Sequence, residues 1–183
     1  MRKFTPFAAA LLLAAAPAAF AAAKAPMVGG AAMYPTRTIV DNAARSKSHT
    51  TLVAAVKAAG LAETLSGAGP FTVFAPTNAA FAKLPAGTVA TLLKPENKPA
   101  LQSVLTYHVV PGRVSAAQLI GKIKAGRGMA KLATVQGGTL TARMISGKVV
   151  LTDEKGGRAT VTQADVFQSN GVIHVTDAVS LPR

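Results

Sequence analysis

The spacing of apolar residues changes along this chain, and that change limits the fold more than any other feature. In the first half, Leu52, Val56 and Ala59 recur at the intervals of one helix face, and Gly60 predicts the helix end. In the second half, apolar and polar residues alternate over residues 139–144, which is the period of a half-buried strand. Helices that precede a group of antiparallel strands predict an α+β domain.

Other local patterns add elements to this outline. Residues 71–75 form a β-branched and aromatic run between two prolines, which predicts a buried strand. Asn170-Gly171 predicts a tight turn, because both residue types accept a positive φ. Further strands are expected over residues 149–151, 159–167 and 172–175, and a further helix over residues 97–107.

The N-terminus predicts export. Arg2 and Lys3 precede an Ala/Leu-rich run that ends in small residues, the pattern of a secretory signal peptide covering residues 1–21 or 1–23. The alternative is a membrane anchor, but the run is weakly apolar and Pro17 interrupts it. Because no second apolar span follows, we expect no transmembrane span after cleavage. We therefore predict a secreted or periplasmic protein with a flexible lead over residues 24–35 and one domain over residues 36–183.

Composition and motif content argue against catalysis. The chain has no cysteine, which excludes disulfides, thiolate metal sites and a cysteine nucleophile. It has no Gly-x-Ser-x-Gly or phosphate-binding glycine motif, and its seven acids give no reason to select a catalytic pair. The three histidines lie far apart, and His174 is expected to be a partly exposed strand residue. We expect no enzyme activity, no metal and no cofactor.

Three stretches together resemble the fasciclin domain family. They are GPFTVFAPTNAAF at residues 69–81, YHVVPG at residues 107–112 and SNGVIHVTD at residues 169–177. The likeness covers about residues 36–183, and QGGTL and QADV look like the bacterial secreted single-domain branch. The resemblance implies a wedge of two packed β-sheets with about seven strands and flanking N-terminal helices. It also implies a secreted or surface-anchored adhesion module.

The first and third stretches are expected to determine the fold. Thr77 should cap the next helix, Asn78 should bond within the same turn, and Asn170-Gly171 should set the register of the last hairpin. These fold-motif residues are Phe71, Thr72, Val73, Phe74, Ala75, Pro76, Thr77, Asn78, Phe81, Asn170, Gly171, Val172, Ile173, His174, Val175 and Asp177.

The Tyr107-His108 pair has two interpretations. In animal relatives this motif is implicated in integrin adhesion, so the resemblance implies an adhesive site. The structural interpretation is that His108 continues the apolar stripe of the preceding helix as a neutral imidazole. Direct integrin binding is not expected, because the chain has neither Asp-Ile nor Arg-Gly-Asp. The candidate residues are Val104, Leu105, Tyr107, His108, Val109 and Val110.

Positive charge is concentrated in the second half. The formal net charge is +13, and the nine cations from Arg113 to Arg158 are opposed only by Asp153 and Glu154. Such a chain attracts polyanions with an affinity that falls as salt rises. Nucleic acid is not expected, because export is predicted and few aromatic residues lie among the cations. The candidate polyanion-binding residues, expected on an exposed loop, are Lys122, Lys124, Arg127 and Lys131.

These observations predict a secreted, non-catalytic interaction module that binds an extracellular protein or matrix component. The first alternative is a cationic binder of envelope or extracellular polyanions, such as acidic polysaccharide, lipopolysaccharide or an anionic envelope surface. The second is an extracellular hydrolase of an acidic polymer, which a cleft holding paired carboxylates or a Ser/His/acid contact would identify.

Overall fold

A computed structural model describes residues 25–183, so the expected signal peptide lies outside the described residues. The helices are α1 (Ile39–Ala43), α2 (Thr50–Ala59), α3 (Ala62–Ser66), α4 (Asn78–Ala82), α5 (Thr88–Leu92), the short 3₁₀ turn η1 (Pro95–Asn97), α6 (Lys98–Tyr107) and α7 (Ala116–Ala125). The strands are β1 (Met27–Val28), β2 (Ala31–Ala32), β3 (Phe71–Pro76), β4 (Val109–Pro111), β5 (Met129–Ala133), β6 (Thr139–Ile145), β7 (Lys148–Thr152), β8 (Arg158–Gln168) and β9 (Gly171–Thr176). Within this part of the chain, no helix has the length and apolar character needed to span a bilayer.

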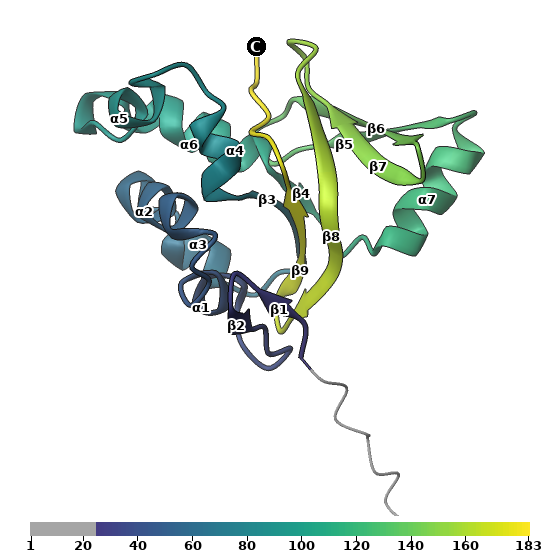
Figure 1. The fold of residues 1–183 in the computed structure, drawn as a ribbon, viewed down its shortest axis with the longest axis horizontal. Coiled ribbons are helices and arrows are strands. Elements are labelled where there is room, and N and C mark those ends of the chain that lie inside the picture. Colours follow the sequence, from purple (N-terminus) through teal and green to yellow (C-terminus); the bar gives the residue numbers. More distant parts are fainter. Residues whose placement is uncertain (1–24) are drawn as a thin grey trace, which may run out of the picture.

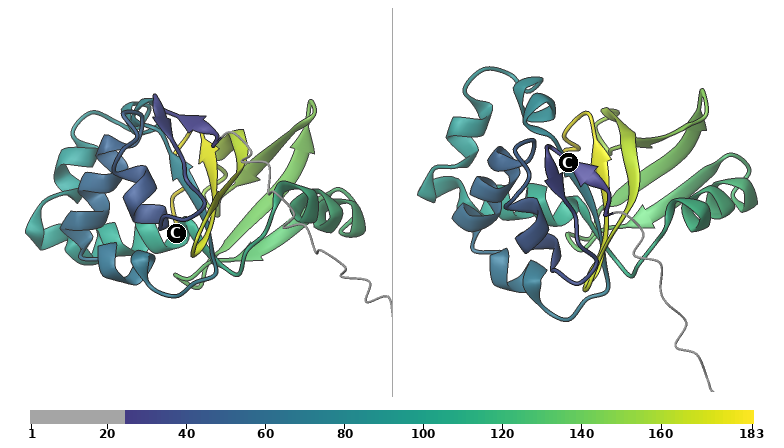
Figure 2. Two further views of the ribbon diagram at one scale, coloured as in Figure 1. Left: turned by 90° about the horizontal axis from the view of Figure 1, so that it is seen from below. Right: turned by 60° about the horizontal axis from the view of Figure 1, so that its bottom comes forward.

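Helices α1 to α6 form a layer of their own, and α7 lies on the other side of the central strands (Figure 1). Figure 1 shows α1 to α6 on one side of the central strands and β5, β6, β7 and α7 on the other. The two turned views in Figure 2 preserve this separation. The α+β class predicted from the sequence is confirmed, and so is the number of main strands, which is seven.

The seven strands form one sheet in the order β4-β3-β9-β8-β7-β6-β5. The long strand β8 joins the two halves, because residues 158–160 pair with β7 and residues 161–168 pair with β9. Two register shifts between Val161 and Val166 interrupt β8 where its partner changes, and such irregularities bend a strand. The expected pair of sheets is therefore one sheet folded over at β8. Its far edges approach each other where the Val135 N–H donates to the Val109 carbonyl at 2.8 Å.

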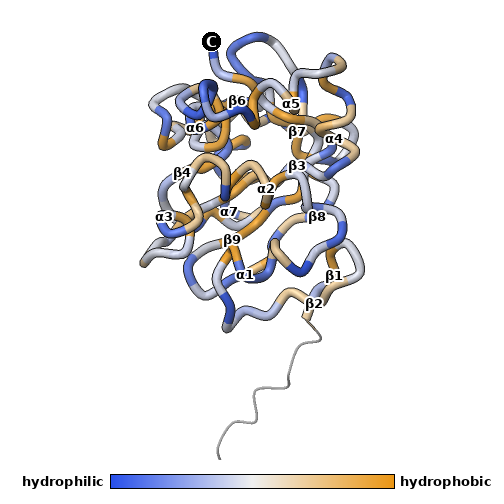
Figure 3. The backbone as a smooth tube through the Cα atoms, turned by 90° about the vertical axis from the view of Figure 1, so that its left-hand side faces the viewer, coloured by the Kyte–Doolittle hydropathy of each residue, from blue (hydrophilic) through white to orange (hydrophobic). Residues whose placement is uncertain are grey.

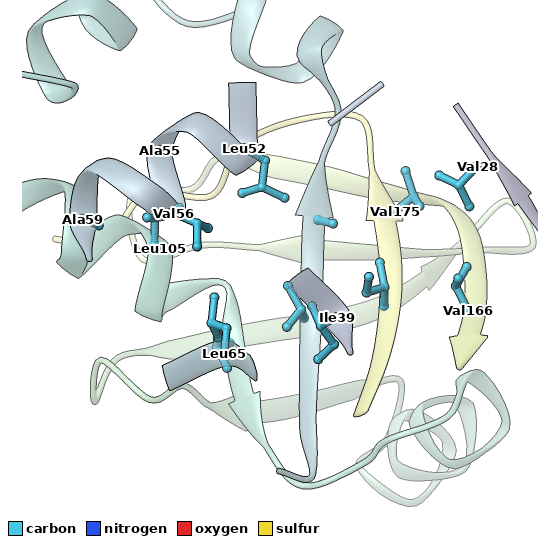
Figure 4. Close-up of a cluster of buried hydrophobic side chains, with 14 of the residues drawn as sticks. Val28, Ile39, Leu52, Ala55, Val56, Ala59, Leu65, Leu105, Val166 and Val175 are labelled. Atoms are coloured by element: carbon cyan, nitrogen blue, oxygen red, sulfur yellow. The ribbon is translucent and has the colours of Figure 1, made fainter. Parts of the chain in front are cut away.

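Two apolar cores fill the layers. The first lies between the helices and the central strands, and Figure 4 shows Ile39, Leu65 and Val175 within it. The second lies inside the folded sheet, where α7 supplies Leu119 and Ile123. In Figure 3 the hydrophobic stretches run through the interior along strands such as β9, and hydrophilic stretches lie at the periphery.

Strand β3 lies between the two cores, which explains its uninterrupted apolar sequence. Val73 and Ala75 face the helices, whereas Phe74 points into the folded sheet. Strand β3 pairs in parallel with β9, from Phe71 opposite Gly171 to Pro76 opposite Thr176. Strands that are buried on both faces lose the polar alternation of a half-exposed strand.

Residues 25–35, which belong to the expected flexible lead, contain an ordered hairpin. The pair Gly29-Gly30 has φ values of 57° and 79° and forms the turn between β1 and β2. Two positive φ values in succession are what the commonest hairpin turn requires. Val28 and Met33, which are 6% and 2% exposed, anchor this hairpin in the helix-side core.

The expected loop around residues 121–131 is wrong, because most of it is regular structure. Helix α7 begins after Ser115, whose side chain accepts from the Gln118 N–H while the Gln118 side chain accepts from the Ser115 N–H. This reciprocal capping box, followed by apolar Leu119 and Ile123, is visible in the sequence. It is the signal that would have predicted the helix.

Candidate functional site

The Tyr107-His108 motif lies where α6 ends and β4 begins. Tyr107 is the last residue of α6, His108 follows it in a helical conformation, and Val109 starts the strand. Two further segments reach this point, the turn after β7 and the segment near the C-terminus. The pair therefore lies at a junction of four segments.

The side chain of Tyr107 connects the start of β6 to the turn after β7 by bonding to the backbone of both. Its hydroxyl donates to the Thr139 carbonyl at 2.8 Å and accepts from the Glu154 N–H at 3.2 Å. The ring is fully buried, and a Cβ on Gly138 would lie only 2.7 Å from ring atom Cε2. Burial raises the pKa of Tyr107, so the phenol stays protonated and keeps donating.

The imidazole of His108 uses both ring nitrogens. Its Nδ1 donates to the Val104 carbonyl at 2.8 Å, and Nε2 accepts from the Ser180 N–H at 3.0 Å. These partners place the proton on Nδ1. Burial lowers the pKa of His108, and the ring is therefore neutral at pH 7. The expectation of a neutral imidazole bonded to backbone agrees with this geometry.

The six candidate adhesion residues share one property: each is at most 9% exposed. Leu105 and Val109 belong to the helix-side core, and Tyr107 and Val110 belong to the core inside the sheet. Figure 4 shows Leu105 against the α2 residues Val56 and Ala59. In the folded state, these six side chains present very little surface to a partner.

A small apolar cavity adjoins His108. Its volume is about 30 Å³, and His108 is the one polar residue among those that line it. A space of this size holds one or two water molecules. Because both ring nitrogens of His108 are already bonded, the cavity resembles a gap in packing and not a reaction cleft.

Asn170, from the third motif, connects α1 and α3 to the start of β9. Its Oδ1 accepts from the Ile39 N–H at 3.0 Å, and its Nδ2 donates to the carbonyls of Leu65 and Gly67 at 2.7 and 3.0 Å. Neither Asn170 nor Gly171 has a positive φ, so the reason given for this turn from the sequence is wrong. Gly171 is needed for space, because a Cβ would lie 2.1 Å from the Phe71 carbonyl oxygen.

The first motif also acts over long range. The Thr77 side chain caps α4 by accepting from the Ala80 N–H at 3.2 Å, as predicted. Asn78 instead caps a different helix, because its Oδ1 accepts from the Thr51 N–H at the start of α2 at 3.0 Å. Its expected bond within the same turn is wrong, since its Nδ2 donates to the Lys47 carbonyl and to the Thr50 hydroxyl.

The other two histidines are buried as well. His174 is 1% exposed, so its expected partial exposure is wrong. Its Nε2 donates to the Val114 carbonyl at 2.8 Å, and its ring stacks on Phe74 with centroids 5.6 Å apart. His49 contacts the Ser46 hydroxyl through Nδ1 at 2.9 Å. Burial lowers the pKa of both rings. Within residues 25–183, no three histidines and acids come together as a metal site.

The four candidate polyanion-binding residues do not form one surface. Lys122 and Lys124 are on α7, and Arg127 is in the turn after it. Lys131 is on β5, where Ala130 and Leu132 point into the core that α7 covers. Because side chains alternate along a strand, Lys131 points to the opposite face of the sheet.

The face of the sheet opposite α7 carries several cations that the sequence analysis did not predict to lie together. We call it the outer sheet face; it consists of the residues of β5 to β8 that point away from α7. Thr141 and Thr152 lie between Lys131 and Arg158 in one cross-strand row. The residues of this face used below are Met129, Lys131, Thr141, Arg143, Ile145, Lys148, Thr152, Arg158 and Thr160. Strand register would have revealed it, and register depends on turns that the sequence only partly specifies.

Comparison with known proteins agrees with this architecture. The sequence profile described as Fasciclin domain matches residues 47–182. The chain belongs to the fasciclin domain family. The family resemblance inferred from the three motifs is therefore confirmed.

Relatives of this fasciclin-domain chain come from bacteria and animals. It is 54% identical to Protein sll1483 of Synechocystis sp., over 87% of this chain and 81% of the relative. It is 38% identical to the immunogenic protein MPB70 of Mycobacterium bovis, over 73% of this chain and 63% of the relative. It is 34% identical to the transforming growth factor-beta-induced protein ig-h3 of Sus scrofa, over 81% of this chain and 20% of the relative.

A solved structure shares the fold. The FAS1 domain pair from the insect cell adhesion molecule fasciclin I superposes with a TM-score of 0.69 at 20% identity. The match covers 79% of this chain and 51% of that one. The wedge-like α+β architecture expected from the family resemblance is confirmed.

Proposed function

We propose that the protein is a secreted or periplasmic, non-catalytic interaction module that binds an extracellular protein or matrix component. One observation carries the proposal: the polar groups of the family motifs bond to the backbone of the protein itself. Tyr107, His108 and Asn170 each connect segments in this way, through bonds to Thr139, Ser180 and Leu65. The motifs therefore build the scaffold, and recognition is left to exposed side chains.

The chemistry of the buried groups also supports a non-catalytic role. A general base needs a nitrogen or carboxylate oxygen that can reach a substrate proton. His108 and His174 engage both ring nitrogens with backbone groups. Asp153 is 7% exposed and accepts from the N–H groups of Gly157 and Leu181. These groups are committed to the fold.

Names of similar proteins support an extracellular setting. Among them are a cell surface glycolipoprotein, MPB83 of Mycobacterium bovis, and an insect cell adhesion molecule. Export of this chain is testable at its N-terminus. Mass spectrometry of the exported protein should find a mature chain that begins at Ala22 or Lys24. Retention of the intact N-terminus inside the cell would contradict the proposal.

The interaction role is tested by capture. Immobilised protein is incubated with envelope and extracellular proteins of the source cell, at low salt and at 300 mM salt. A specific partner stays bound at the higher salt, whereas purely electrostatic contacts are released. The proposal fails if every captured protein is released, or if the purified protein cleaves an acidic polymer.

Binding of polyanions is a second candidate function, favoured by the unopposed cations of β5 to β8. Within residues 25–183, the ion pairs between side chains are Lys83–Asp177 and Lys94–Glu96, and neither involves this region. Retention on a heparin-like resin that weakens steeply with salt would support this function. Absence of retention at low salt would exclude it.

A further inference from the structure

We propose that the outer sheet face is the binding surface for an acidic polysaccharide. This inference rests on the second function proposed above, and it names both the site and the ligand class. It assigns the binding to Lys131, Arg143, Lys148 and Arg158. Of the predicted set it keeps only Lys131 and leaves out Lys122 and Lys124 on α7 and Arg127 in the turn after it.

The strand register spreads the four cations across the face. Lys131, Arg143, Lys148 and Arg158 come one each from β5, β6, β7 and β8, and all four are exposed. Lys131 and Arg158 mark the two ends of one row, three strand spacings or about 14 Å apart. A linear polymer with repeated negative charges could contact several of these cations at once.

Hydroxyl groups lie between the cations. Thr141 and Thr152 occupy the middle of the row that joins Lys131 to Arg158, and Thr160 lies two residues beyond Arg158 on β8. A threonine hydroxyl both donates and accepts, which matches the hydroxyl groups of a sugar. The face therefore offers cations for carboxylates or sulfates and hydroxyls for the sugar ring.

Within residues 25–183, no acid forms an ion pair with the four cations of this face. Residues 129–133, 139–145 and 148–152 contain no Asp or Glu. The nearest acids in sequence, Asp153 and Glu154, accept from backbone N–H groups of Gly157 and Thr139 at 2.7 and 3.0 Å. Both oxygens of Asp153 and one oxygen of Glu154 accept from backbone N–H groups. Asp177 accepts from the Thr160 N–H at 2.7 Å and lies 3.8 Å from the Lys83 ammonium. None of these acids forms an ion pair with the four cations, which therefore retain their attraction for an external anion.

The same face favours a polysaccharide over a lipid surface. Its exposed large apolar side chains are Met129 and Ile145, at 37% and 42% exposure, and both lie at the β6–β7 hairpin end. A membrane-binding surface carries a broad apolar face that enters the bilayer. Cations and threonines cover most of this face instead.

The test compares two variants with the same change in charge. The face variant is Lys131→Thr, Arg143→Thr, Lys148→Thr and Arg158→Thr, because threonine already occupies strand positions on this face. The control variant is Arg45→Ala, Lys47→Ala, Lys57→Ala and Lys98→Ala, which removes four exposed cations on the helix side. Binding of the full chain to polygalacturonate, with neutral dextran as reference, is measured between 50 and 200 mM salt.

We expect the wild-type and control proteins to bind polygalacturonate and to lose about 10- to 100-fold in affinity over this salt range. The face variant should bind at least tenfold more weakly at 50 mM salt, with a shallower salt dependence. Circular dichroism and urea unfolding should show that both variants remain folded. Equal loss in both variants would overturn the assignment to this face.

Two further results separate this inference from the function on which it rests. If wild-type protein binds no polygalacturonate, the inference and the polyanion function both fail. If the face variant binds normally while a Lys122→Ala, Lys124→Ala, Arg127→Ala variant does not, the polyanion function stands and this inference is overturned.

A lipid surface is tested with a single fluorophore, because the chain contains no tryptophan. Ile145→Trp should show no blue shift with vesicles of phosphatidylglycerol and phosphatidylcholine beyond that of the control Val135→Trp. A blue shift for Ile145→Trp alone, with tighter binding to vesicles than to polygalacturonate, would overturn the polysaccharide in favour of a membrane.

Discussion

The Tyr107-His108 junction and the outer sheet face differ in how visible they are in the sequence and in how exposed they are in the structure. The junction has a conspicuous sequence motif, yet its six candidate residues are at most 9% exposed. The outer sheet face has no motif, yet its four cations are exposed. Tyr107 and His108 are adjacent in the chain, so the pair forms a recognisable string even though three of its four bonding partners lie in distant segments. The residues of a sheet face are every second residue of four separate strands, so they form no recognisable string in the sequence.

The polar groups of the two regions also have different partners. At the junction, Tyr107 and His108 bond to backbone groups at 2.8–3.2 Å. On the outer sheet face, none of the four cations forms an ion pair within residues 25–183. Substitutions in the motifs should therefore change stability, whereas substitutions on the face should change binding.

The largest effect is expected for Asn170→Ala. This change leaves the Ile39 N–H and the carbonyls of Leu65 and Gly67 without their side-chain partner. Each unsatisfied buried group costs about 1–3 kcal/mol, so the free energy of unfolding should fall by about 3–6 kcal/mol in urea titration. Asn97→Ala removes one exposed bond to Thr91 and should cost less than about 1 kcal/mol. Similar losses in the two variants would show that Asn170 has no special role.

The next largest effect is the dependence of the free energy of unfolding on pH. Burial lowers the pKa of His49, His108 and His174 below the unfolded value of 6.5. The unfolded chain then binds more protons than the folded protein at low pH. Stability is therefore complete above pH 6.5 and falls below it, by up to about 1.4 kcal/mol per pH unit for each histidine.

Urea titrations between pH 5 and pH 8 measure this dependence. His49→Gln replaces the titrating ring with a polar side chain that does not titrate, at a site where Nε2 of His49 has no hydrogen-bond partner within residues 25–183. It should make the slope shallower. Stability that does not change from pH 8 to pH 5 would contradict the neutral state assigned to the three rings.

A smaller effect is expected for Tyr107→Phe. The variant keeps the buried ring and removes the hydroxyl that joins Thr139 to Glu154. The free energy of unfolding should fall by about 1–3 kcal/mol. Affinity for a bound partner should stay unchanged under conditions where the variant is folded. Loss of binding without loss of stability would place adhesion at the motif after all.

The smallest effect on stability is expected for the face variant. Exposed cations without ion pairs contribute little to folding, and threonine suits a strand. In urea titration, the free energy of unfolding should stay within about 0.5 kcal/mol of the wild-type value. A much larger loss would mean that Lys131, Arg143, Lys148 or Arg158 supports the fold.

Local patterns were enough to predict the elements whose signals are local. Helix α2 ends at Gly60 in the left-handed conformation, as the sequence predicts. Strands β6 and β7 meet at Ser146-Gly147, where both residues have a positive φ. Thr77 caps α4 as predicted. In each of these, the deciding contacts lie within a few residues of one another.

Where the structure differs from the predictions made from the sequence, the cause is mostly contacts between distant segments. The parallel pairing of β3 with β9 buries His174, which was expected to be a partly exposed strand residue. Asn78 caps a helix that ends nearly twenty residues earlier in the chain, which no local rule predicts. The hairpin of β1 and β2 is ordered by the burial of Met33 and not by its glycines alone. Helix α7 is the exception, because its capping box was present in the sequence.

Affinity for polygalacturonate, measured at 50 mM salt for Tyr107→Phe and for the face variant side by side, tests the division between scaffold and binding surface most directly. The structure predicts wild-type affinity for Tyr107→Phe and a loss of at least tenfold for the face variant. Wild-type affinity for the face variant, with loss for folded Tyr107→Phe, would contradict it.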